Sequence, residues 1–341
     1  MKNQIKFIEF CAAEAGELLR AFGRLGLNYS GKHKTKNIFL FEQGDITFIA
    51  NCERTGYAAE HCAEHGPSIV SLGLQMQDDT IMDKAAALGY QTFTAREAKT
   101  GITLPSIVGP GNVLVRTFSE NSWNEFKTIH FDMQPSELFR PDYCLLNIDH
   151  IAVNARKGNL EAWREFYFNV FDFIETSDFI IQGKQTAFRC NPTASQCGNI
   201  KIVLNEDFED GSQISEFIQA NNGDGIQHIA FKSSSMPYSV SRLVDNEINF
   251  MKTPDSYYDL IDGRIPGHGE NVEELRKHNI LIDNDRYDKN AILLQVFTES
   301  LIGPIFFELI HRKGNEGFGE GNVKALFEAV ELDQRKRGLL A

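Results

Sequence analysis

The 341-residue sequence lacks several features that would define its class. No apolar run approaches the roughly 18 residues of a membrane span, and the opening MKNQIKFIEFCAAEAGELL has no uninterrupted apolar segment of a signal peptide. The six cysteines, at positions 11, 52, 62, 144, 190 and 197, form no CxxC pair and no spacing typical of a disulfide framework. We therefore expect a cytoplasmic protein with free thiols and no membrane partner.

Positive charge is also scarce. The chain has 34 Lys and Arg against 47 Asp and Glu, which gives a formal net charge of −13. Such an excess of negative charge opposes binding to nucleic acid or to an anionic membrane surface. The composition, with 42% hydrophobic residues, is that of an ordinary globular protein, so a small-molecule partner is favoured.

A repeating order of elements organises the chain. Four segments open with a short strand pattern at Ile5, Ile69, Ile148 and Ile226, at intervals of 64, 79 and 78 residues. Each opening is followed by an amphipathic helix, such as EAWREFYFNVF, and then by further strand-like runs. The pattern predicts an α+β fold of four βαβββ units, paired into two open β-barrel domains because one unit cannot bury its own sheet.

The unit boundaries predict two domains. The stretch HFDMQPSELFRPDY, residues 130–143, has two prolines and little apolar periodicity, so we interpret it as the linker. The domains are then residues 1–135, without a metal, and residues 144–341. The last segment, NVKALFEAVELDQRKRGLL, has the periodicity of a C-terminal helix.

Two of the opening strands carry a histidine at the same position. His150 lies in IDHIAVN and His228 in IQHIAFK, so pairing of the two units should bring both imidazoles into one cavity. A third polar group, Glu308, lies on the otherwise apolar strand GPIFFELIHRKG, where a carboxylate is costly unless it is paired or bound to a cation. Two histidines and a carboxylate are the ligand set of non-heme Fe(II) oxygenases. A buried histidine is more often part of the hydrogen-bonded core, but the shared repeat position favours a metal site.

The first two units differ at these positions. We align His150 and His228 with Phe7 and with Gly73 or Leu74, none of which is a metal ligand. The N-terminal half is therefore expected to hold no metal.

Longer motifs carry a family resemblance. The segments GIQHIAF (225–231), LLQVFTESLIGPIFFELIHRKGNEGFGEGN (293–322) and the terminal FEAVELDQRKRGLL resemble 4-hydroxyphenylpyruvate dioxygenases, including the bacterial legiolysins, of the vicinal-oxygen-chelate, glyoxalase-like superfamily. The resemblance covers essentially the whole chain. It implies that His150, His228 and Glu308 bind Fe(2+) and that the C-terminal helix is a lid. It also implies conversion of 4-hydroxyphenylpyruvate and O2 to homogentisate and CO2 in tyrosine catabolism, by a homodimer or homotetramer.

The resemblance further implies a set of pocket residues. Four amide side chains are expected to orient the substrate, because amides can hold a phenol oxygen without adding charge: Gln227, Gln295, Gln213 and Asn205. Other matched positions are expected to line or close the pocket: Phe297, Phe306, Phe318 and Asn322. The glycines of GFGEGN would permit a lid hinge.

Four positions depart from the family pattern. Cys190 stands where the family commonly has serine, Asn191 where it has arginine, Val203 where it has proline and Val323 where it has phenylalanine. Related hydroxymandelate synthases carry a small aliphatic residue near the last position. The substrate-binding residues Cys190, Val203 and Val323 therefore suggest an alternative, namely benzylic hydroxylation or a related aryl-pyruvate substrate.

Two further classes share the predicted fold. Extradiol ring cleavage would use the same ligand set and would consume a catechol without releasing CO2. A non-catalytic binding module would take up no oxygen and hold no iron. The complete ligand set, in phase with the repeat, makes the binding module the weakest of these readings.

Overall fold

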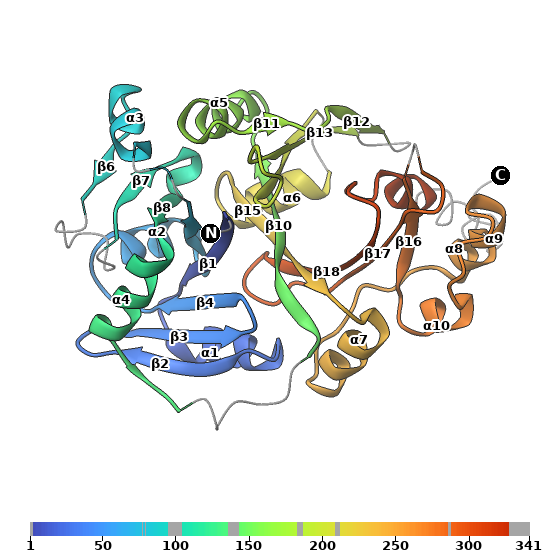
Figure 1. Cartoon of the computed structure of the whole chain (residues 1–341), viewed down its shortest axis with the longest axis horizontal. Coiled ribbons are helices and arrows are strands. Elements are labelled where there is room, and N and C mark those ends of the chain that lie inside the picture. Colours follow the sequence, from blue (N-terminus) through green and yellow to red (C-terminus); the bar gives the residue numbers. More distant parts are fainter. Residues whose placement is uncertain are drawn as a thin grey trace.

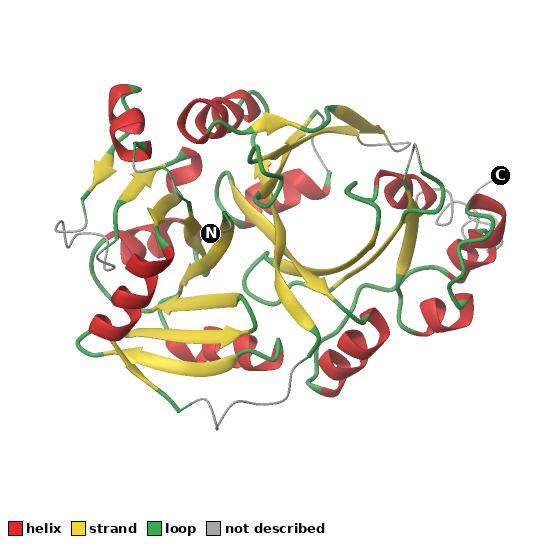
Figure 2. Ribbon diagram, viewed as in Figure 1, coloured by secondary structure: helices red, strands yellow, loops and turns green. Residues whose placement is uncertain are grey.

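The computed structural model describes residues 3–76, 78, 80–94, 104–135, 143–182, 187–208, 212–285 and 288–326. In this part of the chain the strands form two nine-stranded mixed sheets with helices packed on the outside (Figures 1 and 2). The second sheet curls into a half-barrel (Figure 2). The predicted α+β fold of paired βαβββ units is confirmed.

The N-terminal half contains the first sheet and four α-helices. Its strands are β1 (Gln4–Cys11), β2 (Asn28–His33), β3 (Ile38–Gln43), β4 (Ile46–Asn51), β5 (Ser68–Gln75), β6 (Thr92–Phe93), β7 (Ser106–Val108), β8 (Leu114–Phe118) and β9 (Phe131–Met133). Its helices are α1 (Ala15–Arg24), α2 (Tyr57–His65), α3 (Ile81–Ala87), the 3-10 turn η2 (Pro110–Asn112) and α4 (Glu120–His130). The strand order is β6-β7-β8-β5-β1-β4-β3-β2-β9.

The C-terminal half contains the second sheet. Its strands are β10 (Leu145–Ala155), β11 (Ile174–Glu175), β12 (Phe179–Gln182), β13 (Ala187–Ala194), β14 (Lys201–Asp207), β15 (Gly225–Ser233), β16 (Leu281–Asn284), β17 (Ile292–Phe297) and β18 (Phe306–Lys313). Its helices are α5 (Leu160–Phe171), α6 (Gln213–Ala220), α7 (Met236–Asp245), α8 (Asp255–Asp259), α9 (Ile261–Arg264) and α10 (Val272–Lys277). The strand order is β11-β13-β14-β10-β15-β18-β17-β16, with β12 paired to β13.

The four predicted opening strands are β1, β5, β10 and β15, and in each sheet two of them pair antiparallel at the centre. The helices that follow them pack through the predicted apolar faces. Leu18 and Phe22 of α1 are fully buried, as are Phe166 and Tyr167 of α5. Burial of such side chains contributes roughly 1.5–3 kcal/mol each, which is why these faces set the position of the helices.

The fourth unit carries an insertion that the other three lack. Helices α8, α9 and α10 lie between α7 and β16 and lengthen the connection from the unit's helix to its second strand. In Figure 1 they stand beside β16, at the end of the half-barrel. The repeat did not predict this insertion.

Two interpretations of the sequence are corrected by the pairing. Part of the supposed linker is a strand, since Phe131–Met133 forms β9 and pairs antiparallel with β2. The equivalent of His228 is Ser71, not Gly73 or Leu74. Ser71 pairs with Glu9 on β1 as His228 pairs with Ala152 on β10, and both lie third in their opening motif.

The two sheets share one apolar core. A single cluster of buried side chains runs from β1 and β4 to β15 and β18. Within it the ring of Phe48 lies 5.8 Å from that of Phe231 and 6.0 Å from that of Phe307. The predicted division into two domains, residues 1–135 and 144–341, therefore remains a prediction. Among the described residues, no helix is both long and apolar enough to cross a membrane.

Candidate metal centre and substrate cavity

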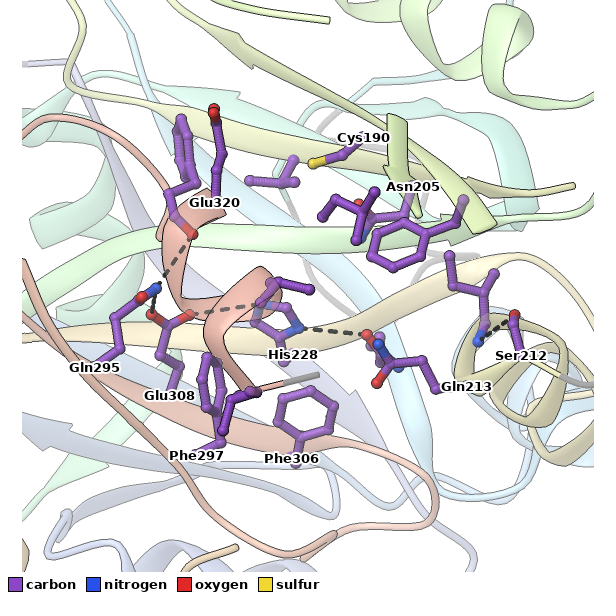
Figure 3. A pocket seen from close by; sticks show the side chains of 18 of the residues that line it. Cys190, Asn205, Ser212, Gln213, His228, Gln295, Phe297, Phe306, Glu308 and Glu320 are labelled. Atoms are coloured by element: carbon purple, nitrogen blue, oxygen red, sulfur yellow. Dashed lines mark hydrogen bonds and ion pairs between the residues drawn. The ribbon is translucent and has the colours of Figure 1, made fainter. Parts of the chain in front are cut away.

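A cavity of about 480 Å³ lies inside the half-barrel of the second sheet. Its walls come from β10, β12 to β15, β17 and β18, from α6, and from the segment around residues 318–326. Figure 3 shows the side chains that line it. Most of this wall is apolar and a few polar groups converge within it, which is the usual composition of a small-molecule site.

His150, His228 and Glu308 meet at this cavity. Each offers one ligand atom, and these atoms lie within 4.8 Å of one another. Glu308 Oε2 is 3.2 Å from His150 Nε2 and 3.6 Å from His228 Nε2. The three groups therefore have the spacing and the chemistry to hold a first-row metal ion.

The strand register explains why these three residues converge. Ala230 pairs with His150 on one side and with Glu308 on the other, so all three side chains share one row and one face of the sheet. His228 lies two residues from Ala230 on the central strand and so points to the same face. The small Ala230 side chain leaves the space between the ligands open. The sequence argument, built on repeat position and strand alternation, found this set because both are regular.

A buried ion pair holds the outer side of His150. Its Nδ1 lies 2.9 Å from Asp149 Oδ1, and Arg312 donates to both carboxylate oxygens of Asp149 at 2.8 Å. Burial raises the pKa of Asp149, but the hydrogen bonds from Arg312 and His150 outweigh it and hold this pKa well below its usual range. An ionised Asp149 accepts the proton on Nδ1, which leaves Nε2 facing the cavity.

The other two candidate ligands are held by amides. His228 Nδ1 lies 3.4 Å from Gln227 Oε1, and burial lowers the pKa of His228 to about 4, so its ring is neutral at neutral pH. Gln295 Nε2 donates to Glu308 Oε1 at 2.8 Å. Burial opposes ionisation of Glu308, but the neighbouring His150 lowers the pKa of this carboxyl below its ordinary value. In each of the three groups, the polar atom turned away from the cavity is held by a neighbour. The other polar atom faces the remaining two groups.

Aromatic side chains enclose the three groups. The ring of Phe306 stacks on His228 with centroids 4.8 Å apart, and Phe297 meets Phe306 edge-on at 6.2 Å. From the opposite side Phe318 contacts His150 edge-on at 5.3 Å. These rings give the ligand end of the cavity an apolar surface, and Phe318 directly precedes the segment predicted to be the lid.

Three predicted amides lie around the rest of the cavity. Figure 3 shows Asn205 and Gln213 on the side of His228 away from Glu308. Asn205 is buried and its Nδ2 donates to Asn154 Oδ1 at 3.3 Å, while Gln213 is exposed at the first residue of α6. Gln227 is buried beside His228. The cavity thus has one end lined by the three candidate metal ligands and another end lined by uncharged amide side chains.

The positions that depart from the family pattern do not all line the cavity. Cys190, Val203 and Val323 do, and burial raises the pKa of the Cys190 thiol, which keeps it neutral. Asn191 instead donates away from the cavity, to Glu175 Oε2 at 2.9 Å and to the Ser177 carbonyl at 3.2 Å.

Asn322 also lies outside the cavity lining and acts through a neighbour. Its Nδ2 donates to Gln295 Oε1 at 2.8 Å. The predicted C-terminal helix is observed over residues 320–326; its remainder, from residue 327, lies outside the described residues.

Sequence reasoning missed several residues of the site. The cavity is also lined by Phe179, Ile181, Phe188, Ser212, Ile214, Met251, Glu320 and Leu326. The pair Asp149 and Arg312 was missed as well. A charged residue directly before His150 in an otherwise apolar strand was the available signal, because buried charges are normally paired. The apolar lining residues have no such signal, since apolar residues are frequent everywhere in the core.

The fold is that of the vicinal-oxygen-chelate class, and its cavity holds a group of three side chains that could bind a metal ion. The family description "Hydroxyphenylpyruvate dioxygenase, HPPD, N-terminal" matches residues 2–134. Over 98% of its length the chain is 38% identical to the 4-hydroxyphenylpyruvate dioxygenase of Pseudomonas aeruginosa, of which it covers 95%. It is 39% identical to the hemolysin VllY of Vibrio vulnificus, over 98% of this chain and 96% of that protein. The chain belongs to the 4-hydroxyphenylpyruvate dioxygenase family.

A solved structure agrees with this assignment. A triple mutant of 4-hydroxymandelate synthase from Streptomyces coelicolor matches with a TM-score of 0.81 and 26% identity, over 97% of this chain and 99% of that one. A likeness over both sheets in full means that the paired-unit architecture, and not one unit alone, is common to the two proteins.

Proposed function

We propose that the protein is an Fe(II)-dependent dioxygenase that converts 4-hydroxyphenylpyruvate and O2 into homogentisate and CO2, a step of tyrosine catabolism. The observation that carries this proposal is the convergence of His150, His228 and Glu308 on one end of a cavity of about 480 Å³ whose other end is lined by neutral amides. The full-length similarity to 4-hydroxyphenylpyruvate dioxygenases supports the choice of substrate.

The donor set fits iron. His150 and His228 would each offer Nε2 and Glu308 would offer Oε2, because the opposite atoms are already held by Asp149, Gln227 and Gln295. Two imidazoles and one carboxylate leave further coordination positions for small molecules. When bound, the iron supplies the redox chemistry with O2 and the chelation of the α-keto acid.

The surrounding residues bind and orient the substrate. Gln213 and Asn205 can hydrogen-bond a para hydroxyl group, and neither adds charge to the cavity. Phe306 and Phe297 offer ring faces and edges to the aromatic group of the substrate. Phe318, on the segment before the lid helix, closes the cavity over His150 and keeps water out.

Anaerobic loading with Fe(II), followed by addition of 4-hydroxyphenylpyruvate and O2, tests this proposal. Oxygen uptake, CO2 release and chromatography of the product are measured together. We expect equal amounts of O2 consumed and CO2 released, and homogentisate as product. Glu308→Gln, which keeps the shape of the side chain and removes its charge, should abolish turnover. Catechol consumption without CO2 would indicate extradiol cleavage, and no uptake of oxygen or iron would indicate a binding module; either result overturns the proposal.

A second candidate function is benzylic hydroxylation of the same substrate. It is favoured by Val323, which lines the cavity from the lid helix where the family commonly has a phenylalanine. The likeness to a 4-hydroxymandelate synthase structure agrees with it. The same chromatogram decides, because the benzylic alcohol and the hydroquinone separate.

We further propose a cytoplasmic homodimer or homotetramer. All six cysteines lie among the described residues and none of them forms a disulfide bond, as expected in a reducing compartment. Sedimentation velocity across a range of protein concentrations would give the mass of the assembly, and a monomer at every concentration would reject this part.

A further inference from the structure

The start of the lid segment is pressed against the second sheet. A Cβ atom on Gly319 would lie 1.8 Å from Gln295 Oε1, and one on Gly321 would lie 2.2 Å from Asp283 Oδ1. The amide of Gly321 donates to Asp283 Oδ2 at 2.8 Å. A side chain at either position would therefore have to displace the Gln295 amide of β17 or the Asp283 carboxylate of β16. This is a different role from the hinge expected from sequence, which remains a prediction.

A chain of hydrogen bonds runs from the insertion to the candidate metal ligand. Arg264 Nη2 donates to the Tyr257 hydroxyl at 2.7 Å, and this hydroxyl donates to Asn322 Oδ1 at 2.7 Å. Asn322 Nδ2 donates to Gln295 Oε1 at 2.8 Å, and Gln295 Nε2 donates to Glu308 Oε1 at 2.8 Å. Tyr257, Asn322, Gln295 and Glu308 are all buried, so water does not compete for these bonds.

The two ends of this chain fix its direction. A carboxylate accepts only, so Gln295 must turn its NH2 group toward Glu308 and its carbonyl toward Asn322. Asn322 must then turn its own carbonyl toward Tyr257, whose hydroxyl keeps its proton because burial raises its pKa. The cation of Arg264 donates at the far end. Every bond is polarised in the same sense, and such chains strengthen one another in a low-dielectric interior.

The consequence for Glu308 is geometric. Gln295 occupies Oε1, and the other oxygen, Oε2, is the one that faces both histidines. The same chain holds the lid, because Asn322 belongs to the lid helix and Arg264 Nη1 also donates to the Gly321 carbonyl at 3.3 Å. Tyr257 reaches both the lid and the sheet, since its hydroxyl accepts from the Ile282 amide at 2.8 Å.

We propose that Tyr257 and Arg264 of the fourth-unit insertion are positioning residues for the metal centre: through Asn322 and Gln295 they orient the Glu308 carboxylate and hold the base of the lid. The inference rests on the proposed function, because it assigns to Glu308 the role of iron ligand. Neither residue lines the cavity, so their effect on the reaction is indirect.

Tyr257→Phe tests the inference, because it removes the hydroxyl and keeps the ring. Tyr258→Phe is the matched control: Tyr258 is the next residue of α8, is also buried, and its hydroxyl lies outside the hydrogen-bond chain. Two measurements do not depend on turnover. One is the rate at which a colorimetric chelator removes Fe(II) from the loaded protein, and the other is hydrogen exchange at the amides of residues 319–323.

We expect Tyr257→Phe to release Fe(II) faster by roughly 10-fold or more, within the range found for partners behind metal ligands. Its amides at residues 319–323 should exchange faster, and kcat should fall more than KM rises. Tyr258→Phe should match the wild type in all three. If Tyr257→Phe does not fold, Arg264→Lys replaces it, since lysine keeps the charge and loses the forked contact to Tyr257 and Gly321.

The outcomes separate this inference from the proposed function. Wild-type rates of Fe(II) release and amide exchange in Tyr257→Phe would overturn the inference and leave the dioxygenase proposal intact. Equal changes in Tyr257→Phe and Tyr258→Phe would also overturn it, because they would indicate a loss of packing alone. If the wild type itself bound no Fe(II), both proposals would fail together.

Discussion

The two sheets have the same strand pairing but carry different side chains at the positions of the candidate metal ligands. Their central strands pair in the same register, so each candidate ligand has an equivalent in the first sheet: Phe7 for His150, Ser71 for His228 and Arg116 for Glu308. A cation in the first sheet thus stands where the second sheet has an anion. The difference shows that the paired-unit fold provides the positions and that a few side chains decide whether a site or a filled core results.

The first sheet satisfies its buried charge internally. Arg116 and Glu9 are fully buried and form an ion pair of 3.1 Å. Asn51 donates to the other carboxylate oxygen of Glu9 at 2.7 Å, and Ser71 lies between the two charges, hydrogen-bonded to both. Such a pair is complete without a ligand, whereas Glu308 faces two imidazoles and open space.

Aromatic packing fills the hollow of the first sheet. The ring of Phe7 stacks on Trp123 of α4 at 5.2 Å and lies across Gly73, where a Cβ atom would be 2.2 Å from the ring. In the second sheet Ala230 takes the place of Gly73 and the cavity stays open. Helix α4 follows β8 as the C-terminal helix follows β18, and in the first half the side chains of α4 are part of the core.

The largest effect is expected from giving the second sheet a residue of the first. His228→Ser places at the ligand position the residue found in the equivalent position of β5. We expect iron binding to be lost and oxygen uptake to fall to background, a loss larger than the roughly 10–100-fold seen for outer partners of metal ligands. Iron content after desalting and oxygen uptake measure it.

A control variant for this experiment lies on the same strand. Lys232→Ser, near the end of β15 and outside the cavity, should retain full iron content. One iron per chain in His228→Ser would contradict the ligand assignment.

The ion pair of the first sheet should matter for stability and not for chemistry. Glu9→Gln removes the carboxylate that forms an ion pair with the buried Arg116 guanidinium, and removal of one partner of a buried ion pair typically costs about 3–5 kcal/mol. Urea unfolding should show this loss, while Fe(II) binding per folded molecule stays at the wild-type value. Glu14→Gln is the control, because Glu14 is exposed and its ion pair with the exposed Arg54 is long, at 4.0 Å. Exposed ion pairs contribute little to stability. Wild-type stability of Glu9→Gln would show that Arg116 needs no counter-charge.

The comparison also shows what sequence could predict. His150, His228 and Glu308 follow from repeat position and strand alternation, which are local and regular signals. The equivalence of Phe7 with His150 followed in the same way. The alignment of Gly73 or Leu74 with His228 was wrong, because Ser71 is the residue that lies third in its opening motif, as His228 does in its own, and its pairing with Glu9 on β1 identifies it as the equivalent.

Long-range contacts could not be predicted. Tyr257 and Asn322 are 65 residues apart and belong to an insertion and to the helix after the fourth unit, both of which lie outside the βαβββ pattern. The strand Phe131–Met133 was also missed, since three residues carry no periodic signal and pair only because the edge of β2 is available. Contacts of this kind depend on tertiary structure that no local pattern encodes.

A smaller effect on Fe(II) binding is expected from a change to Asp149, the hydrogen-bond partner of His150. Asp149→Asn removes the charge that fixes the imidazole, so Fe(II) affinity should fall by roughly 10–100-fold while the ligand set stays complete. Chelator competition measures it. Asp178→Asn, which breaks a half-exposed ion pair with Arg189 outside the cavity, should leave the affinity unchanged. Unchanged affinity in Asp149→Asn would reject the outer role of Asp149.

The smallest effect is expected from a substitution that partly fills the cavity of the second half with an aromatic ring, as the first half is filled. Val323→Phe adds a ring to the C-terminal helix, at residue 323, as Trp123 provides one on α4. An aromatic contact contributes about 0.5–1.5 kcal/mol, so KM for 4-hydroxyphenylpyruvate should change by only a few fold. Any mixed product should shift toward ring hydroxylation, because the ring narrows the cavity around the substrate. Lys324→Phe, on the next and exposed residue, should leave both quantities unchanged. A product ratio equal to that of the wild type would show that position 323 does not direct the reaction.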